Sequence, residues 1–163
     1  MYSIGLGCLL EINDDNETVQ LITGKGIETI ISEEFDFRQN IEFFQDTVSR
    51  ENIKKWNSLK NKNLLLYAQT IEELYECIKN LHPVRKGIRL KSEGKQYIVN
   101  DNQLNEATNT QSAIWQNSSG RKSLDEMFAS MTKSDVLRKN NKVQEFVESI
   151  VGLVRAGVLY LLY

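Results

Sequence analysis

The side chains that most often carry out catalysis are scarce in this sequence. It holds one histidine, His82, and two cysteines, Cys8 and Cys77. Acid–base, nucleophilic and zinc chemistry each need several such groups held together, and these three do not form a recognisable set. The carboxylates of Asp14-Asp15 and of Glu33-Glu34 are chain neighbours, so within each pair they point in different directions. We therefore expect no catalytic residue, no metal ligand and no cofactor, and we expect that the chain is not an enzyme.

Two glycine pairs, Gly5-Leu6-Gly7 and Gly24-Lys25-Gly26, lack the features of a phosphate-binding loop. Such a loop needs a longer glycine pattern that follows a strand and opens a helix. Gly24-Lys25-Gly26 leads into another strand-like segment, so we interpret it as a hairpin turn. Binding is the function class that remains.

Charge is distributed unevenly along the 163 residues, although the net charge is only −2. Residues 1–83 contain 8 Lys and Arg against 14 Asp and Glu, whereas residues 84–163 contain 12 against 8. An acidic half followed by a basic half suggests two modules, the second of which would favour an acidic partner. Such asymmetry is also common on a solvated surface without a partner, and that interpretation stays open.

The most apolar stretch, Ser149–Tyr163, is 15 residues long and contains Arg155. A helix that spans a membrane needs about 20 apolar residues. The first residues lack the basic flank of a targeting segment. We expect a soluble, cytoplasmic protein with no membrane partner.

Alternating apolar residues predict three strands in the first half, over residues 3–13, 17–23 and 27–32. Turn residues separate them, namely Asp14-Asp15-Asn16 and Gly24-Lys25-Gly26. These three segments could be a small antiparallel sheet.

Helical signals follow the three strands. Phe37, Ile41 and Phe44 have helical spacing, and Ser49 is a candidate N-cap for the next helix. Leu64–Tyr67 is short and apolar and predicts a buried strand. Thr70-Ile71-Glu72-Glu73 is a capping-box pattern that predicts the start of another helix.

Proline at position 83 indicates where the modules meet. Proline disfavours a helical conformation at the residue before it, so the helix that begins after Thr70 should end near His82. The charge balance changes sign at the same place. We expect an α+β module over residues 1–83 and a second domain over residues 84–163.

The second half repeats the layout of the first. Strands are expected over residues 88–90, 96–100 and 104–108, separated by the turns Ser92-Glu93-Gly94 and Asp101-Asn102. Three helices should follow, carrying Ile114-Trp115, Met127-Phe128 and, in the last one, residues 143–154. This order of a three-stranded sheet and three helices is that of a winged helix-turn-helix.

Residues 89–163 resemble the PqqD-like peptide-recognition domain, also called the RiPP recognition element. Arg89-Leu90 and Tyr97-Ile98-Val99 are similar to its first two strands. Ala113-Ile114-Trp115, Gly120 and the capping box Ser123–Met127 are similar to its central stretch. The pattern from Val147 to Leu159 is similar to its closing stretch. The first half follows the layout more loosely: it is either a degenerate second copy or an α/β module built on Leu64–Tyr67 and the helix after Thr70.

The resemblance implies capture of a leader peptide. Domains of this family hold the leader of a ribosomally made precursor peptide as an added strand on the third strand, against the last helix. Strand addition takes affinity from backbone hydrogen bonds and specificity from side-chain pockets. The expected peptide-binding residues are Leu104, Asn105, Glu106, Ala107, Thr108, Lys139, Lys142, Val143, Phe146, Val147 and Ile150.

Two partners follow from this interpretation, a precursor peptide and a separate peptide-modifying enzyme. The protein itself would be a non-catalytic binding protein, with Lys139 and Lys142 suited to an acidic leader. Two alternatives remain: a winged-helix DNA-binding regulator, for which nucleic acid is the less favoured partner, and a protein-interaction or immunity protein of mixed α+β fold.

Overall fold

A computed structural model describes residues 2–23, 25–34 and 50–163. It is a mixed α+β protein with several small antiparallel sheets, which confirms the α+β class that was expected. The chain divides into two compact units. Unit 1 comprises the residues up to Cys77 together with Leu162–Tyr163, and unit 2 comprises Ile78–Leu161. No helix within the described ranges is long and apolar enough to cross a membrane.

The division between the units falls before Pro83, not at it. Residues 82–85, where the modules were expected to meet, form a strand of unit 2. The sequence-based boundary at 83/84 would therefore cut a strand in two.

Strands and helices alternate in blocks along both units. Up to the division the elements are β1 (Tyr2–Gly5), β2 (Cys8–Asn13), η1 (Asp14–Asn16), β3 (Thr18–Thr23), β4 (Gly26–Ile31), α2 (Arg50–Asn61), β5 (Leu65–Ala68) and α3 (Ile71–Ile78). After it they are β6 (His82–Arg85), β7 (Ile88–Ser92), β8 (Lys95–Asn100), β9 (Gln103–Ala107), α4 (Asn109–Asn117), α5 (Leu124–Lys133), α6 (Lys142–Arg155) and β10 (Leu159–Leu162). The helical pattern of Phe37, Ile41 and Phe44 and the cap at Ser49 lie outside the described residues.

Unit 1 contains an antiparallel sheet in the order β2-β3-β4 and a separate pair, β1 with β5. The strand expected over residues 3–13 is thus two strands with different partners. The break lies at Leu6-Gly7, where the Leu6 amide donates to the Leu64 carbonyl and Gly7 has φ +82°. A Cβ atom on Gly7 would lie 2.9 Å from the Ile22 carbonyl oxygen, so glycine is required there.

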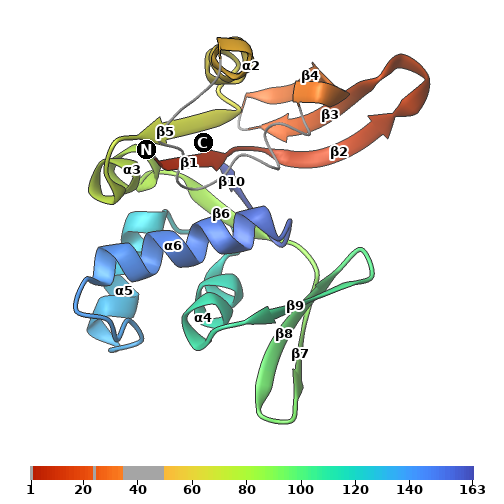
Figure 1. Ribbon diagram of the computed structural model, residues 1–163. Coiled ribbons are helices and arrows are strands. Elements are labelled where there is room, and N and C mark those ends of the chain that lie inside the picture. The colour runs from red at the N-terminus through yellow and green to blue at the C-terminus, as the bar shows by residue number, and fades with distance from the viewer. Residues whose placement is uncertain (1, 24, 35–49) are drawn as a thin grey trace. The chain divides into compact units, whose positions relative to one another are not determined.

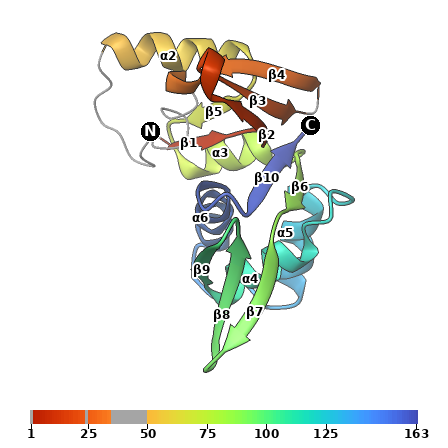
Figure 2. The ribbon, with the colours of Figure 1, turned by 90° about the vertical axis from the view of Figure 1, so that its right-hand side faces the viewer.

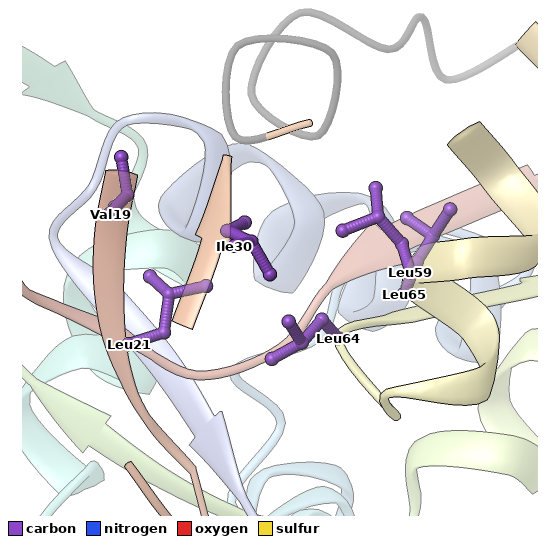
Figure 3. Packing of buried hydrophobic residues seen from close by; sticks show 6 residues of the cluster. All are labelled: Val19, Leu21, Ile30, Leu59, Leu64 and Leu65. Atoms are coloured by element: carbon purple, nitrogen blue, oxygen red, sulfur yellow. The ribbon is translucent and has the colours of Figure 1, made fainter. Parts of the chain in front are cut away.

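The core of unit 1 joins its sheet to α2 and β5. Its fully buried side chains, shown in Figure 3, are Val19, Leu21, Ile30, Leu59, Leu64 and Leu65. The expectation that residues 64–67 form a buried strand is confirmed in part, since β5 begins at Leu65 and Leu66 and Tyr67 are half-buried. The capping box before α3 is confirmed: the Glu73 amide donates to the Thr70 hydroxyl, and the Thr70 amide donates to the Glu73 carboxylate.

Unit 2 contains the antiparallel sheet β7-β8-β9 and the pair β6 with β10. Figures 1 and 2 show β7, β8 and β9 as neighbouring strands joined by tight turns. The turns are Glu93-Gly94, with φ +51° and +79°, and Asp101-Asn102, with φ +48° and +64°. Positive φ at both central residues is the geometry that two-residue hairpins favour.

The helices of unit 2 pack on one another around a fully buried Phe146 of α6. The Phe146 ring lies 5.2 Å from that of Phe128 on α5, measured between centroids. The predicted capping box at Ser123 and Glu126 is present at the start of α5. Trp115 of α4 is buried, and its indole donates to the Lys86 carbonyl at 3.0 Å.

The two units repeat one arrangement. In each, a first strand, a glycine with positive φ and a three-stranded antiparallel meander come before a strand that pairs back with the first. The described helices between the meander and that strand are α2 in unit 1 and α4, α5 and α6 in unit 2. Gly7 in unit 1 corresponds to Gly87 in unit 2. A Cβ atom on Gly87 would lie 2.3 Å from the Val99 carbonyl oxygen, as one on Gly7 would meet the Ile22 carbonyl oxygen.

The hydrogen bonds at the end of the helix that precedes the returning strand, α2 in unit 1 and α6 in unit 2, repeat as well. The Leu64 amide donates to Leu59 and the Val158 amide donates to Leu153, each closing the end of a helix. The carbonyls of Leu64 and Val158 in turn accept from Leu6 and Lys86. The chain order and these paired contacts favour a second copy of one layout over an α/β module built on Leu64–Tyr67 and the helix after Thr70.

Candidate functional site

The third strand of the unit 2 sheet, β9, has one side without a partner strand among the described residues. The residues of β9 that face this open side follow from the two-residue turn at Asp101-Asn102. In such a hairpin the flanking residues, Asn100 and Gln103, form a hydrogen-bonded pair, and bonded and non-bonded pairs then alternate. The backbone N–H and C=O groups of Leu104 and Glu106 therefore point to the open side.

Aliphatic side chains lie on the outer face of this sheet. Ile88, Val99 and Leu104 are register partners across the three strands and share one face. Ile88 is 61% exposed and Leu104 is 62% exposed. A strand added beside β9 would find an apolar neighbour at Leu104.

Glu106 lies in the next row of the same face. Its carboxylate accepts a hydrogen bond from the Lys95 ammonium at 3.0 Å, and both side chains are exposed. This hydrogen bond, with the attraction of the carboxylate, raises the pKa of Lys95 above its ordinary value. The pair is a surface ion pair that salt and water screen, so it contributes little to stability.

A pocket of about 250 Å³ lies at the end of β9. Its lining comes from the start of α4, the segment before α6 and the first turns of α6. The lining residues are Thr108, Thr110, Gln111, Lys139, Glu145, Glu148 and Ser149. Each of these side chains carries a hydrogen-bonding group, and two pairs of them, Thr110 with Glu145 and Lys139 with Glu148, are bonded to each other.

Glu145 is the most buried charge of this pocket, with 8% of its surface exposed. Burial alone would raise the pKa of its carboxyl group, but hydrogen bonds from the Lys139 amide, the Thr110 hydroxyl and the Arg138 amide lower that pKa below its ordinary value. Glu145 therefore stays ionised and ties the segment before α6 to α4.

The two lysines expected at the site are paired with carboxylates. Lys139 lines the pocket and lies 3.2 Å from Glu148, while Lys142, the first residue of α6, lies 3.8 Å from Asp135. The structure thus brings Thr108 and Lys139 together at the end of β9. It does not leave either lysine without a negative neighbour.

The apolar stripe expected to line the groove lies in the core. Phe146, Val147 and Ile150 are 0% exposed, and Val143 is half-buried. The spacing that predicted an apolar face on the last helix was right, but that face is covered by this chain's own residues. A peptide could not contact these three side chains in this conformation, so they are corrected to core residues.

His82 and Cys77, the other residues considered for chemistry, do not line the pocket at the end of β9. His82 begins β6, although it was expected at the end of a helix, and Cys77 is an exposed free thiol near the end of α3. Within the described ranges no three His, Cys, Asp or Glu side chains are grouped so that they could hold a metal ion.

Sequence reasoning missed five pocket residues: Thr110, Gln111, Glu145, Glu148 and Ser149. A signal for one of them was present, since Thr108-x-x-Gln111 is a capping-box pattern. The structure contains that box: the Gln111 amide donates to the Thr108 hydroxyl, and the Thr108 amide donates to the Gln111 side chain. Glu145 gave no such signal, because its partners are 35, 7 and 6 residues away.

No family model, no curated protein and no solved structure matches this chain.

Proposed function

We propose that unit 2 binds an extended peptide as a fourth strand on the open edge of β9. The observation that carries this proposal is the outward direction of the Leu104 and Glu106 backbone groups on a strand with no described partner on that side. An added antiparallel strand would take its backbone hydrogen bonds from these two residues.

The peptide that the resemblance suggests is the leader of a ribosomally made precursor. In this proposal the chain is a non-catalytic cytoplasmic partner that holds the leader for a separate modifying enzyme. Support comes from the order β7-β8-β9 followed by α4, α5 and α6, which is the order that the resemblance implies.

Specificity would come from the two ends of the edge. Next to Leu104, the exposed aliphatic row with Ile88 favours apolar side chains of the peptide. At the other end, the pocket beyond Thr108 favours a hydrogen-bonding side chain. Because Lys139 and Lys142 already have carboxylate neighbours, each would add only about 0–1 kcal/mol of attraction to an acidic peptide.

The DNA-binding alternative has less support. It needs cations on the last helix that are available to phosphates. Four basic residues in or beside the last helix were the candidates: Arg138, Lys139, Lys142 and Arg155. Two of them, Lys139 and Lys142, are near carboxylates.

The test is a titration of the purified chain with synthetic peptides that tile the short reading frames next to its gene. Glu106→Pro removes an N–H that faces the open edge but takes no part in the ladder with β8, so the sheet should persist. We expect at least a tenfold loss of affinity for the peptide that binds.

Lys91→Pro is the matched control. Lys91 lies on β7, the opposite edge, and alternation from the Glu93-Gly94 turn points its N–H outward as well. Its affinity should stay within about twofold of wild type, and circular dichroism should show both variants folded. Equal affinity in all three proteins, or amide shifts confined to residues 2–77, would contradict the proposal.

A further inference from the structure

The outer strand of the unit 1 sheet, β4, is an edge strand that contains no lysine, proline or bulge. It pairs with β3 on one side, and no described strand pairs with its other side. Edge strands commonly carry lysine, proline or a bulge that prevents association. β4 has none of these: its register with β3 is continuous, and Glu28 is its one charged residue. The opposite edge, β2, does have a register shift, between Leu9 and Glu11.

Three residues of β4 offer their backbone to the open side. The Ser32 amide donates to the Glu17 carbonyl at 2.8 Å, which fixes the alternation of bonded pairs along β3 and β4. Ile27, Thr29 and Ile31 are consequently the residues whose N–H and C=O groups point outward. Their side chains share the exposed face, with Ile27 61% and Ile31 50% exposed.

This edge is complementary to itself. If two copies pair antiparallel about a two-fold axis at Thr29, then Ile27 of one copy lies opposite Ile31 of the other. The two Thr29 side chains lie opposite each other. Aliphatic pairs and Thr–Thr pairs stabilise adjacent strands. Glu28 lies opposite Ile30 of the second copy, so the arrangement opposes no like charges.

The corresponding strand of unit 2 is not complementary to itself in this way. The outward residues of β9 are Leu104 and Glu106. A two-fold pairing of β9 about its central residue, Asn105, would place the aliphatic Leu104 opposite the charged Glu106. Self-complementarity therefore distinguishes β4 from β9.

We propose that this chain forms a symmetric dimer through β4, in which two three-stranded sheets become one continuous sheet. A two-fold contact of this kind is closed, so association stops at two copies. One pair of short strands buries less than the roughly 1,000 Å² typical of stable interfaces, so the dimer should depend on concentration.

Sedimentation velocity of the full chain over a concentration series measures this association directly. The mass should rise from 18.8 kDa toward twice that value. Thr29→Lys would place two ammonium groups opposite each other on the axis, and we expect it to weaken dimerisation at least tenfold. Gln20→Lys is the matched control, because Gln20 is the register partner of Thr29 on the central strand β3, one strand away from the edge. The control should dimerise within about twofold of wild type.

A second variant, Thr29→Pro, removes an outward N–H that the ladder with β3 does not use, and circular dichroism checks that it remains folded. It should be monomeric. A wild-type chain that stays monomeric at millimolar concentration would overturn the proposal. It would do so even if β4 pairs with a strand of another protein, because the proposed partner is a second copy of this chain. Equal dimerisation of Thr29→Lys and Gln20→Lys would also overturn it.

Discussion

Among single residues, Glu145 of α6 is a buried carboxylate that holds α4 and the segment before α6 together. Its carboxylate accepts from a hydroxyl on α4 and from two backbone amides before α6. Hydrogen bonds to a charged group are each worth about 1.5–3 kcal/mol, more than those between neutral groups. Glu145 thereby positions three of the segments that surround the pocket.

Replacement of Glu145 by glutamine should change the pH dependence of stability. The folded-state pKa of Glu145 is lowered, so its stabilising contribution is complete above the unfolded-state value near 4.5 and is lost as the pH falls through the folded-state value. We expect Glu145→Gln to lower the free energy of unfolding by about 1–2 kcal/mol at pH 7 and by less at pH 3. Urea unfolding at a series of pH values measures the difference.

Glu148→Gln serves as the control for that measurement. Glu148 lines the same pocket, but its pair with Lys139 is partly exposed and should contribute no more than about 1 kcal/mol. Parallel stability curves for wild type and Glu145→Gln between pH 3 and 5 would contradict the role given to Glu145.

At the scale of helices and strands, local signals in the sequence were reliable. The strands 88–92, 95–100 and 103–107 and the helix starts after Thr70 and Ser123 agree with the predictions. Each depends on residues within a few positions of one another, such as a two-residue turn or a capping box.

The errors concern contacts between distant residues. The segment 3–13 alternates like one strand, but Leu6 bonds to Leu64 and Gly7 approaches Ile22, which divide it. The stripe on α6 was recognised, but its periodicity does not say what covers it. Register and burial depend on tertiary partners that a single sequence does not display.

The substitution Gly87→Ala tests why the chain breaks between β6 and β7. This break corresponds to the one at Gly7 between β1 and β2. Alanine at position 87 would have to adopt a positive φ of +89°. Its Cβ atom would also lie 2.3 Å from the Val99 carbonyl oxygen. We expect a loss of about 3 kcal/mol or more in the free energy of unfolding of unit 2. Urea denaturation followed by Trp115 fluorescence reports on this unit once the second tryptophan, Trp56 of α2, is replaced by phenylalanine in both proteins.

Gly94→Ala separates the cost of the positive φ from the cost of the close contact with the Val99 carbonyl oxygen. Gly94 has a positive φ of +79°, but a Cβ atom at this position would have no neighbouring atom within 4 Å. The free energy of unfolding of this variant should therefore fall by only about 1–2 kcal/mol, which is the cost of the left-handed backbone alone. If the two variants lose the same amount, the close approach at Gly87 contributes nothing and the explanation is wrong.

At the scale of the whole molecule, the chain consists of two versions of one arrangement whose open edges differ in chemistry. β4 presents Ile27, Thr29 and Ile31, whereas β9 presents Leu104 and Glu106. In the two proposals made above, the same backbone layout serves self-association in unit 1 and peptide binding in unit 2. The difference lies in a few side chains on the outer strand of each sheet.

The position of the division between the units can be tested with two fragments, 78–163 and 84–163. The longer one begins where unit 2 begins, and the shorter one begins at the boundary that charge and proline suggested. The shorter fragment lacks the buried Leu81 and half of β6. It also lacks the carbonyls of Lys79, Leu81 and Pro83, which accept from the Asp125, Leu124 and Gly120 amides.

We expect fragment 78–163 to unfold cooperatively, and fragment 84–163 to be less stable by several kcal/mol or unfolded. Burial of one leucine side chain is worth about 1.5–3 kcal/mol, and each lost backbone hydrogen bond adds about 1 kcal/mol. Thermal unfolding followed by circular dichroism compares the two fragments, and amide spectra show whether 78–163 keeps the fold it has in the full chain. Equal stability would mean that residues 78–83 are a linker and that the division lies at Pro83. An unfolded 78–163 would mean that unit 2 depends on unit 1 for its stability.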